Sequence, residues 1–333
     1  MNQLLLLDCT LRDGGYVNNW KFGRENIETI VHGLERTGIR MLELGFLRDE
    51  MFDPDSSNFS NIEEVNKLLN HKRDEIIYSV MLEAFNPYPL EKLSKYKDGG
   101  IDLIRVCIWK RCMKEHMEYC RAVAKKGYKI TIQPSRVEQY NDDEFVDMLK
   151  RSNEIVPYAV YVVDTWGTQS SAQICHYLEL ADKYLNSDIK IGYHGHNNKL
   201  QALSCAQAAM DMQLNRDLCI DSSIMGMGRG AGNLNTEIVM EHFNELYDMK
   251  FDVQTVIDIF NTSLSEVYHK LPWGYSMYYF LCAINGCNPN YATYFSDHLL
   301  GEELFIKLLY SLSEKEKIVF NKEFVESKIA SLS

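Results

Sequence analysis

The chain has 333 residues, 46% of them hydrophobic and 25% charged, with only 7 Pro, a composition that excludes collagen-like, disordered and low-complexity proteins. Its 35 Lys and Arg against 47 Asp and Glu leave a formal net charge of −12, which repels phosphate backbones and anionic lipid surfaces. We therefore expect neither nucleic acid nor a membrane as a partner. No apolar run approaches the ~18–20 residues of a membrane helix, and the 9 scattered cysteines without a C-x-x-C pair predict reduced thiols and a cytoplasmic protein.

Short runs rich in Val, Ile and Leu predict eight strands, at residues 4–8, 41–45, 76–81, 103–108, 129–133, 159–163, 189–194 and 218–222. Helical spacing predicts helices between them, at 25–36, 62–69, 112–124, 143–152, 172–184, 200–210 and 236–246. A strand followed by a helix, repeated eight times at intervals of about 30 residues, predicts an α/β fold of the (β/α)8 TIM-barrel type. A doubly wound open sheet is the alternative.

After residue 248 the alternation ends, and helical spacing without strand signals predicts helices at 253–267, 275–284, 297–313 and 322–330. We therefore expect a barrel domain over 1–248 and a helical C-terminal extension over 249–333. Aromatic-rich turns at 272–276 and 288–291 can either cap a site or simply pack.

The first predicted strand leads into Arg12 and Asp13, which places a guanidinium and a carboxylate where the carboxyl-end loops of a barrel build its active site. The alternative is a surface ion pair. At the seventh strand, side-chain alternation points His194 and His196 to one face, ~7 Å apart along the strand, with Gly195 between them. Two imidazoles in this arrangement are half of a metal site or a pair of structural histidines.

Closure of a barrel brings strands one and seven to either side of strand eight, so Asp13 can face both histidines across one rim. The loop after strand eight contains Gly230, Gly232 and Asn233, which predicts a phosphate or carboxylate pocket with Asn233 as a fourth ligand. One carboxylate, two imidazoles and an amide oxygen suit a divalent metal, namely Mn, Mg, Co or Zn. Such an ion stabilises an enolate oxygen, and Arg12 adds to that stabilisation.

Together these motifs resemble the superfamily of metal-dependent pyruvate aldolases, isopropylmalate synthases and hydroxymethylglutaryl-CoA lyases. The resemblance spans residues 1–248 and rests on segments 8–14, 194–196 and 230–233. It implies that Asp13, His194 and His196 bind the metal with help from Asn233, and that Arg12 contacts the substrate oxyanion. Two further residues match the family pattern, the strand-two carboxylate Glu43 and the strand-six Asp164.

Within this superfamily the chain looks closest to 4-hydroxy-2-oxovalerate aldolases, which implies small 2-oxo acid and aldehyde substrates and, as a possible partner, an aldehyde dehydrogenase. One departure is Tyr16, which stands where those aldolases carry a His as general base. A phenol with an ordinary pKa near 10 is a poor base at pH 7. The candidates are Tyr16 as donor and acid, a metal-bound water as base, or Tyr275 and Tyr291 reaching in from the tail.

Two further arginines are predicted to point toward the same rim, Arg105 on strand four and Arg136 after strand five. Each can hold a substrate carboxylate or phosphate, or can form an internal ion pair with Glu43, Glu83 or Asp164. Glu43 can in turn act directly or orient Arg12 through a buried pair.

The leading hypothesis is a metal-dependent aldolase that works through a pyruvate enolate. The alternatives are a Claisen-type acyl-CoA synthase or lyase on the same scaffold, and a non-catalytic barrel that has lost its base. The aromatic tail also predicts a homo-oligomer, because exposed Tyr and Trp favour burial at interfaces.

Overall fold

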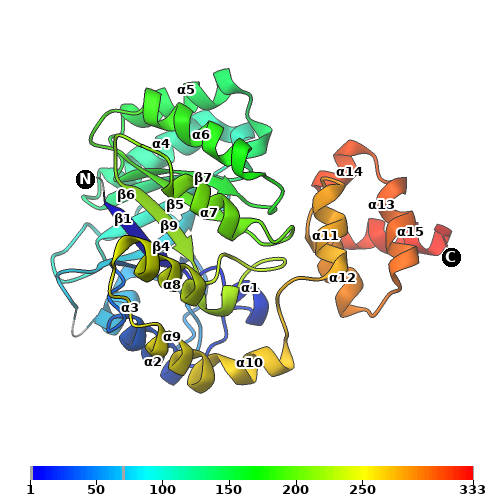
Figure 1. The fold of residues 1–333 in the computed structure, drawn as a ribbon, viewed down its shortest axis with the longest axis horizontal. Coiled ribbons are helices and arrows are strands. Elements are labelled where there is room, and N and C mark those ends of the chain that lie inside the picture. Colours follow the sequence, from blue (N-terminus) through cyan, green and yellow to red (C-terminus); the bar gives the residue numbers. More distant parts are fainter. Residues whose placement is uncertain (1–2, 70–71, 333) are drawn as a thin grey trace.

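The computed structural model describes residues 3–69 and 72–332 and contains a closed parallel barrel (Figure 1). Strand β1 is hydrogen-bonded to both β2 and β9, which closes the sheet and excludes the open-sheet alternative. The predicted TIM barrel is therefore confirmed. Its strands are β1 (Leu4–Asp8), β2 (Met41–Leu47), β4 (Ile77–Glu83), β5 (Leu103–Ile108), β6 (Lys129–Pro134), β7 (Ala159–Asp164), β8 (Lys190–Gly195) and β9 (Leu218–Ser222).

Helices cover the outside of this barrel (Figure 1). Local sequence sets where several begin: Asn141 with Glu144, and Ser170 with Gln173, form capping boxes at the starts of α5 and α6. The helices of this layer are α2 (Arg24–Leu34), α3 (Ile62–Asn66), α4 (Met113–Ala124), α5 (Asp142–Asn153), α6 (Ser171–Tyr184), α7 (Ala202–Met210) and α8 (Thr236–Tyr247). The short helix α1 (Gly15–Asn18) instead follows Asp13 in the loop after β1.

The connection after β4 departs from the predicted repeat of a helix after every strand. Residues 84–102, all of them described, form turns and irregular structure without a helix. Pro87 and Pro89 explain this, because each proline lacks a backbone N–H and restricts the residue before it to extended conformations. An additional two-residue strand, β3 (Asn58–Phe59), pairs with β2 at its carboxyl end.

The barrel interior changes from apolar to charged along the strands. The amino-terminal part of the interior is filled by an apolar cluster that includes Met41, Leu103 and Cys219. Two residues further along the same strands, the same face carries charged side chains, because strand side chains alternate between faces. These residues are Glu43, Arg105 and Asp221, all buried. The charged layer lies below the carboxyl-end rim, where TIM-barrel active sites are built.

The C-terminal part of the chain divides between two hydrophobic clusters. Helix α9 (Val253–Ile259) contributes Val256 and Ile259 to the cluster of the barrel, and α10 (Ser265–Lys270) follows it. The next helices form a separate cluster at one side of the barrel (Figure 1). They are α11 (Met277–Ile284), α12 (Asn290–Asp297), α13 (Glu302–Ser311), α14 (Glu314–Ile318) and α15 (Lys322–Leu332). The domain boundary at 248 stays a prediction.

One tail helix was wrongly delimited by the sequence pattern. The predicted helix 297–313 corresponds to α13, which is shorter than predicted. The preceding helix, α12, begins within the segment 288–291 that was predicted as a turn. Pro289 sits at the N-cap of α12, where a missing N–H costs no helical hydrogen bond. Within the described residues, none of the helices is both long and apolar enough to span a membrane. All the cysteines, each within the described residues, are free thiols.

The second cluster predicts separate local stability for α11–α15. Replacing Phe305, which is fully buried there, with Ala should cost about 3–5 kcal/mol. Hydrogen exchange should accelerate over residues 277–332 and stay unchanged in the barrel strands. The control is Tyr310→Ala, because Tyr310 lies on the same helix but is 78% exposed. Faster exchange in the barrel strands of Phe305→Ala would contradict separate stability.

Candidate metal centre and active site

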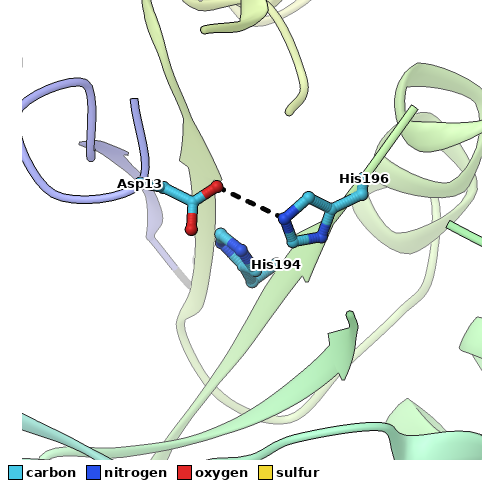
Figure 2. A group of neighbouring side chains, drawn as sticks. All are labelled: Asp13, His194 and His196. Atoms are coloured by element: carbon cyan, nitrogen blue, oxygen red, sulfur yellow. Dashed lines mark hydrogen bonds and ion pairs between the residues drawn. The ribbon is translucent and has the colours of Figure 1, made fainter. Parts of the chain in front are cut away.

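Asp13, His194 and His196 meet at the carboxyl-end rim (Figure 2). Asp13 lies in the loop after β1, His194 lies near the end of β8, and the backbone of His196 forms a bridge with Asn233. One ligand atom from each of the three side chains lies within 4.8 Å of the others, and all three side chains are buried. The structure therefore brings together the three residues that the sequence proposed as metal ligands.

Hydrogen bonds fix which nitrogen of each histidine is free. His196 Nδ1 lies 3.1 Å from the backbone oxygen of Asp164, which only accepts, so Nδ1 carries the proton. His194 Nδ1 lies 3.0 Å from Asp221 Oδ2 and is protonated for the same reason. Each Nε2 therefore has a free lone pair directed at the rim. Acceptors behind histidine ligands are the usual way in which proteins orient such ligands.

The arrangement around Asp13 fits a bound cation. Asp13 Oδ2 faces His196 Nε2 at 3.3 Å, and both atoms carry lone pairs when the histidine is protonated at Nδ1 (Figure 2). In this neutral form of His196 the two acceptors repel unless a positive charge lies between them, and in the doubly protonated form Nε2 donates to Asp13 instead. In addition, Asn233 donates from Nδ2 to Asp13 Oδ2 at 2.8 Å, while its buried Oδ1 has no partner among the described residues. The donor set of two imidazoles, a carboxylate and an amide oxygen suits a divalent metal.

A continuous network of buried ionic side chains connects the two histidines through the barrel interior. Glu43 Oε2 accepts from Arg12 Nε at 2.7 Å and from Arg105 Nη1 at 2.9 Å. Arg12 Nη1 donates to Asp13 Oδ1, and Arg105 Nη2 donates to Asp221 Oδ2. In order of contact, the network is His196, Asp13, Arg12, Glu43, Arg105, Asp221 and His194. Three carboxylates and two guanidiniums leave one excess negative charge, which favours a cation at the open end.

Burial and neighbouring charges set the protonation states of this network. Burial by itself raises the pKa of a carboxyl group, but Arg12 and the histidines outweigh it and hold the pKa of Asp13 well below its ordinary value. Burial also raises the pKa of Asp221, but Arg105 and His194 lower it by more, so the pKa of Asp221 stays below its ordinary value. Burial lowers the pKa of His194. Ionised carboxylates and a neutral imidazole are the forms that bind a metal.

A recess of about 210 Å³ opens above the three ligands. This volume lies below the ~300–1,000 Å³ of sites for drug-sized ligands, so it suits a small acid. Tyr16, Glu83, Cys107 and Trp109 line it beside the ligands and Arg12. Burial raises the pKa of Cys107 to about 12, which keeps it a thiol. Tyr16 is 37% exposed, and the partial desolvation of its hydroxyl raises its pKa, which keeps it a phenol. Neither is therefore a base at neutral pH.

The other predicted site residues lie outside this recess. Arg105 is fully buried and takes the ion-pair alternative, with Glu43 and Asp221 as its partners. Arg136 lies at the outer rim, where its Nε is 2.7 Å from Glu138 Oε1.

The two loop glycines shape the backbone next to the site. Gly230 and Gly232 have φ values of +67° and +83°, and a Cβ at Gly232 would lie 1.9 Å from the oxygen of Gly226. Only glycine fits such a turn. Asn198 Oδ1 holds the loop by accepting from the N–H of Ala231 at 2.7 Å. The loop thereby places Asn233 against Asp13, and neither glycine lines the recess.

Sequence reasoning did not single out Asp221 or Arg229 as site residues. The alternation of β9 contained a signal for Asp221, since it shares the inner face of the barrel with Cys219. Arg229 lines the recess, and its backbone N–H faces Asp13 Oδ2 at 3.4 Å. Its glycine-rich loop has no periodicity, so no pattern in the sequence indicates where Arg229 points.

One family model matches part of the barrel. Residues 107–262 match the HMGL-like family model. The matched segment includes His194, His196 and Asn233, and the loop that carries Arg12 and Asp13 precedes it.

Two curated proteins are similar to the chain over most of its barrel. It is 26% identical over 246 residues to oxaloacetate decarboxylase from Mycobacterium tuberculosis, across 71% of this chain and 68% of that protein. It is 24% identical over 261 residues to 4-hydroxy-2-oxovalerate aldolase from Geobacillus genomosp. 3, across 77% and 73%.

Solved structures confirm the fold of the chain. An N-terminal domain from Bacteroides vulgatus superposes with a TM-score of 0.77 at 23% identity, covering 92% of this chain and all of that domain. HMG-CoA lyase from Brucella melitensis superposes with a TM-score of 0.61 at 17% identity, covering 78% and 96%. At these identities the likeness concerns the fold.

The ionic network makes a prediction about metal affinity. Asp221→Asn removes the negative charge that binds Arg105 and that accepts from His194 Nδ1. We expect divalent-metal affinity, measured by titration calorimetry, to fall about 10–100-fold. The matched control is Asp217→Asn, because Asp217 lies just before β9 and pairs with Lys190 away from the site. Equal metal affinity in Asp221→Asn and the unmodified protein would show that the network does not orient the ligand.

Proposed function

We propose that the protein is a divalent-metal-dependent carbon–carbon lyase that cleaves or forms a 2-oxo acid, such as 4-hydroxy-2-oxovalerate, through a pyruvate enolate. The observation that carries this proposal is the convergence of Asp13, His194 and His196 beside Arg12 in one small recess. These three residues would hold the metal, and Asn233 Oδ1 would add a fourth ligand. Bound there, Mn, Mg, Co or Zn would polarise the keto group of the substrate and offset negative charge on its oxygen.

Arg12 is held in position to stabilise the developing oxyanion. Its Nε is bound to Glu43 and its Nη1 to Asp13, while Nη2 has no hydrogen bond to any described residue. The guanidinium lines the recess, so Nη2 is the donor left for the substrate. A fixed donor of this kind stabilises charge without having to reorganise during the reaction. In this proposal Glu43 positions Arg12, and Arg105 positions Asp221.

The bond changes balance as follows in the cleavage direction. The C4 hydroxyl of 4-hydroxy-2-oxovalerate gives its proton to a water molecule in the recess, the C3–C4 bond breaks, and the electron pair passes to the enolate of pyruvate. The aldehyde leaves, and C3 of the enolate takes up a proton to give pyruvate.

Proton exchange of pyruvate tests the proposal directly. Purified protein loaded with Mn or Mg should exchange the methyl protons of pyruvate in deuterated water, followed by proton NMR. Asp13→Asn and removal of the metal by a chelator should each reduce exchange at least 100-fold, because the ligand set is lost. No exchange by a metal-loaded protein would overturn the proposal. Exchange of acetyl-CoA instead would point to the acyl-CoA alternative.

Decarboxylation of a 2-oxo diacid such as oxaloacetate is the second candidate, and Tyr16 is the observation that favours it. Retro-aldol cleavage needs a base for the C4 hydroxyl, whereas decarboxylation breaks the C3–C4 bond with loss of CO2 and then needs only a proton at C3. The raised pKa of the Tyr16 phenol keeps it protonated at neutral pH, so it has a proton to give to C3 of the enolate. The similarity to oxaloacetate decarboxylase agrees with this chemistry.

Variants of Tyr16 separate the two reactions. Tyr16→Phe should lower kcat for oxaloacetate decarboxylation at least 100-fold with little change in KM, because the proton donor is lost. Tyr16→His installs a base and should raise aldol cleavage relative to decarboxylation. Both products are measured with metal-loaded protein, against the background of metal alone. Unchanged kcat in Tyr16→Phe would exclude the phenol as donor.

The homo-oligomer, the dehydrogenase partner and the cytoplasmic location stay predictions.

A further inference from the structure

A second cavity, of about 450 Å³, lies between the barrel rim and the C-terminal helices. It shares Trp109, Ser135, Thr165 and Arg229 with the lining of the recess, so the two spaces adjoin. Its opposite wall comes from residues 288–290 and 318–320 of the C-terminal helices. A substrate whose reacting end fills the recess can therefore extend into this cavity.

Positive charge is concentrated in this cavity. Arg111, Arg136 and Arg229 line it, and no Asp or Glu is among the described residues of its lining. The chain as a whole carries a net charge of −12, so a cavity with only cationic ionisable side chains departs from the general surface. Such a local field attracts an anionic group.

Each of these guanidiniums lies against an aromatic ring. Arg111 Cζ is 4.2 Å from the ring centroid of Trp109, and Arg136 Cζ is 3.3 Å from that of Trp166. Arg229 Cζ is 5.7 Å from the ring of Tyr16. Stacking restricts the planar guanidinium and leaves its edge for hydrogen bonds, which reduces the conformational entropy lost when a ligand binds.

The arginines keep donors that the described residues do not use. The Arg111 side chain makes no ion pair or hydrogen bond within the described part of the chain. Arg136 uses Nε for Glu138, and neither of its Nη atoms has a partner there. Arg229 donates from Nη2 to Asn290 Oδ1 at 3.3 Å, which ties the barrel rim to α12. Several N–H groups therefore remain to bind a ligand.

The backbone at Arg136 is unusual and supports a binding role. Its φ of +60° is in the left-handed region, which is unfavourable for a residue with a side chain. The backbone N–H of Arg136 donates to Thr165 Oγ1 at 2.8 Å, and Thr165 lines both cavities. Strained residues of this kind are found where function requires a fixed side chain. Here the side chain is held over Trp166, at the wall of the cavity.

We propose that this cavity binds a phosphate ester at the far end of the aldehyde substrate. A phosphate monoester carries about −1.5 to −2 charges and three acceptor oxygens, which matches a set of arginines. A carboxylate has a single charge and is satisfied by one bidentate guanidinium. The inference rests on the proposed function for the reacting end alone, since binding of the phosphate needs no turnover.

Titration calorimetry on the metal-loaded full chain tests the site, with glycerol 3-phosphate, glycerate and glycerol as ligands. Glycerol 3-phosphate should bind at least tenfold more tightly than glycerate, and glycerol should bind weakest. Arg111→Gln and Arg136→Gln should each weaken phosphate binding at least tenfold, because a charge-assisted hydrogen bond is lost. Arg151→Gln is the matched control, since Arg151 pairs with Asp147 on the exposed face of α5.

A further variant distinguishes loss of the guanidinium from misfolding as the cause of weaker binding. Arg136→Lys keeps the charge but loses the planar fork, so its affinity should fall between those of the unmodified protein and Arg136→Gln. Equal affinity for glycerol 3-phosphate in Arg111→Gln and the unmodified protein would overturn the site, because the phosphate would then bind elsewhere. Equal affinity for glycerate and glycerol 3-phosphate would overturn the choice of phosphate.

The two proposals fail independently. Pyruvate exchange without phosphate binding would refute the phosphate site and leave the lyase proposal in place. Phosphate binding without pyruvate exchange would refute the lyase proposal and leave the anion site in place. If both hold, a phosphorylated hydroxyaldehyde should show at least a tenfold lower KM than its unphosphorylated form, and Arg111→Gln should remove that difference.

Discussion

The structure of the site depends on a buried chain of ion pairs that crosses the barrel from one candidate metal ligand to another. Glu43 Oε2 is shared by Arg12 and Arg105, so movement of either arginine disturbs both histidine-bearing ends of the network. Removing one partner from a buried ion pair typically costs about 3–5 kcal/mol, because the remaining charge stays buried without compensation. The network therefore fixes Asp13 and His194 before any ligand binds, and its excess negative charge makes the open end suitable for a cation.

Barrel geometry explains how such a network can form. Parallel strands place residues of equal parity on the inner face, so an apolar layer with Met41, Leu103 and Cys219 lies beneath a charged layer with Glu43, Arg105 and Asp221. The apolar layer fills the amino-terminal half of the interior, and the charged layer supports the rim. Loops then complete the site: the glycine-rich turn before Asn233 needs left-handed backbone that only glycine adopts without strain.

The two cavities suggest a division of roles between the barrel and the C-terminal helices. The small recess holds Asp13, His194, His196 and Arg12, the residues that carry the reaction in the proposed function. The larger cavity is bounded on one side by the C-terminal helices, through residues such as Asn290, which accepts a hydrogen bond from Arg229. Substrate choice in such a design changes with the outer cavity, while the reaction type stays with the inner recess.

The sequence by itself determined the barrel, the helical tail and the group of Asp13, His194 and His196, because strand periodicity and the positions of strand ends are local properties. It left open whether Arg105 binds substrate or an internal carboxylate, and it gave Asp221 and Arg229 no role. Only the tertiary structure decided these, since they depend on which strands become neighbours and on how irregular loops fold over the rim. Local prolines explain why no helix follows β4, in a segment where the sequence shows no helical spacing. Packing between distant segments explains the shifted helices of the tail. The arginine-lined cavity is formed by segments more than 170 residues apart in sequence, such as Arg111 and Asn288, so no local pattern could have predicted it.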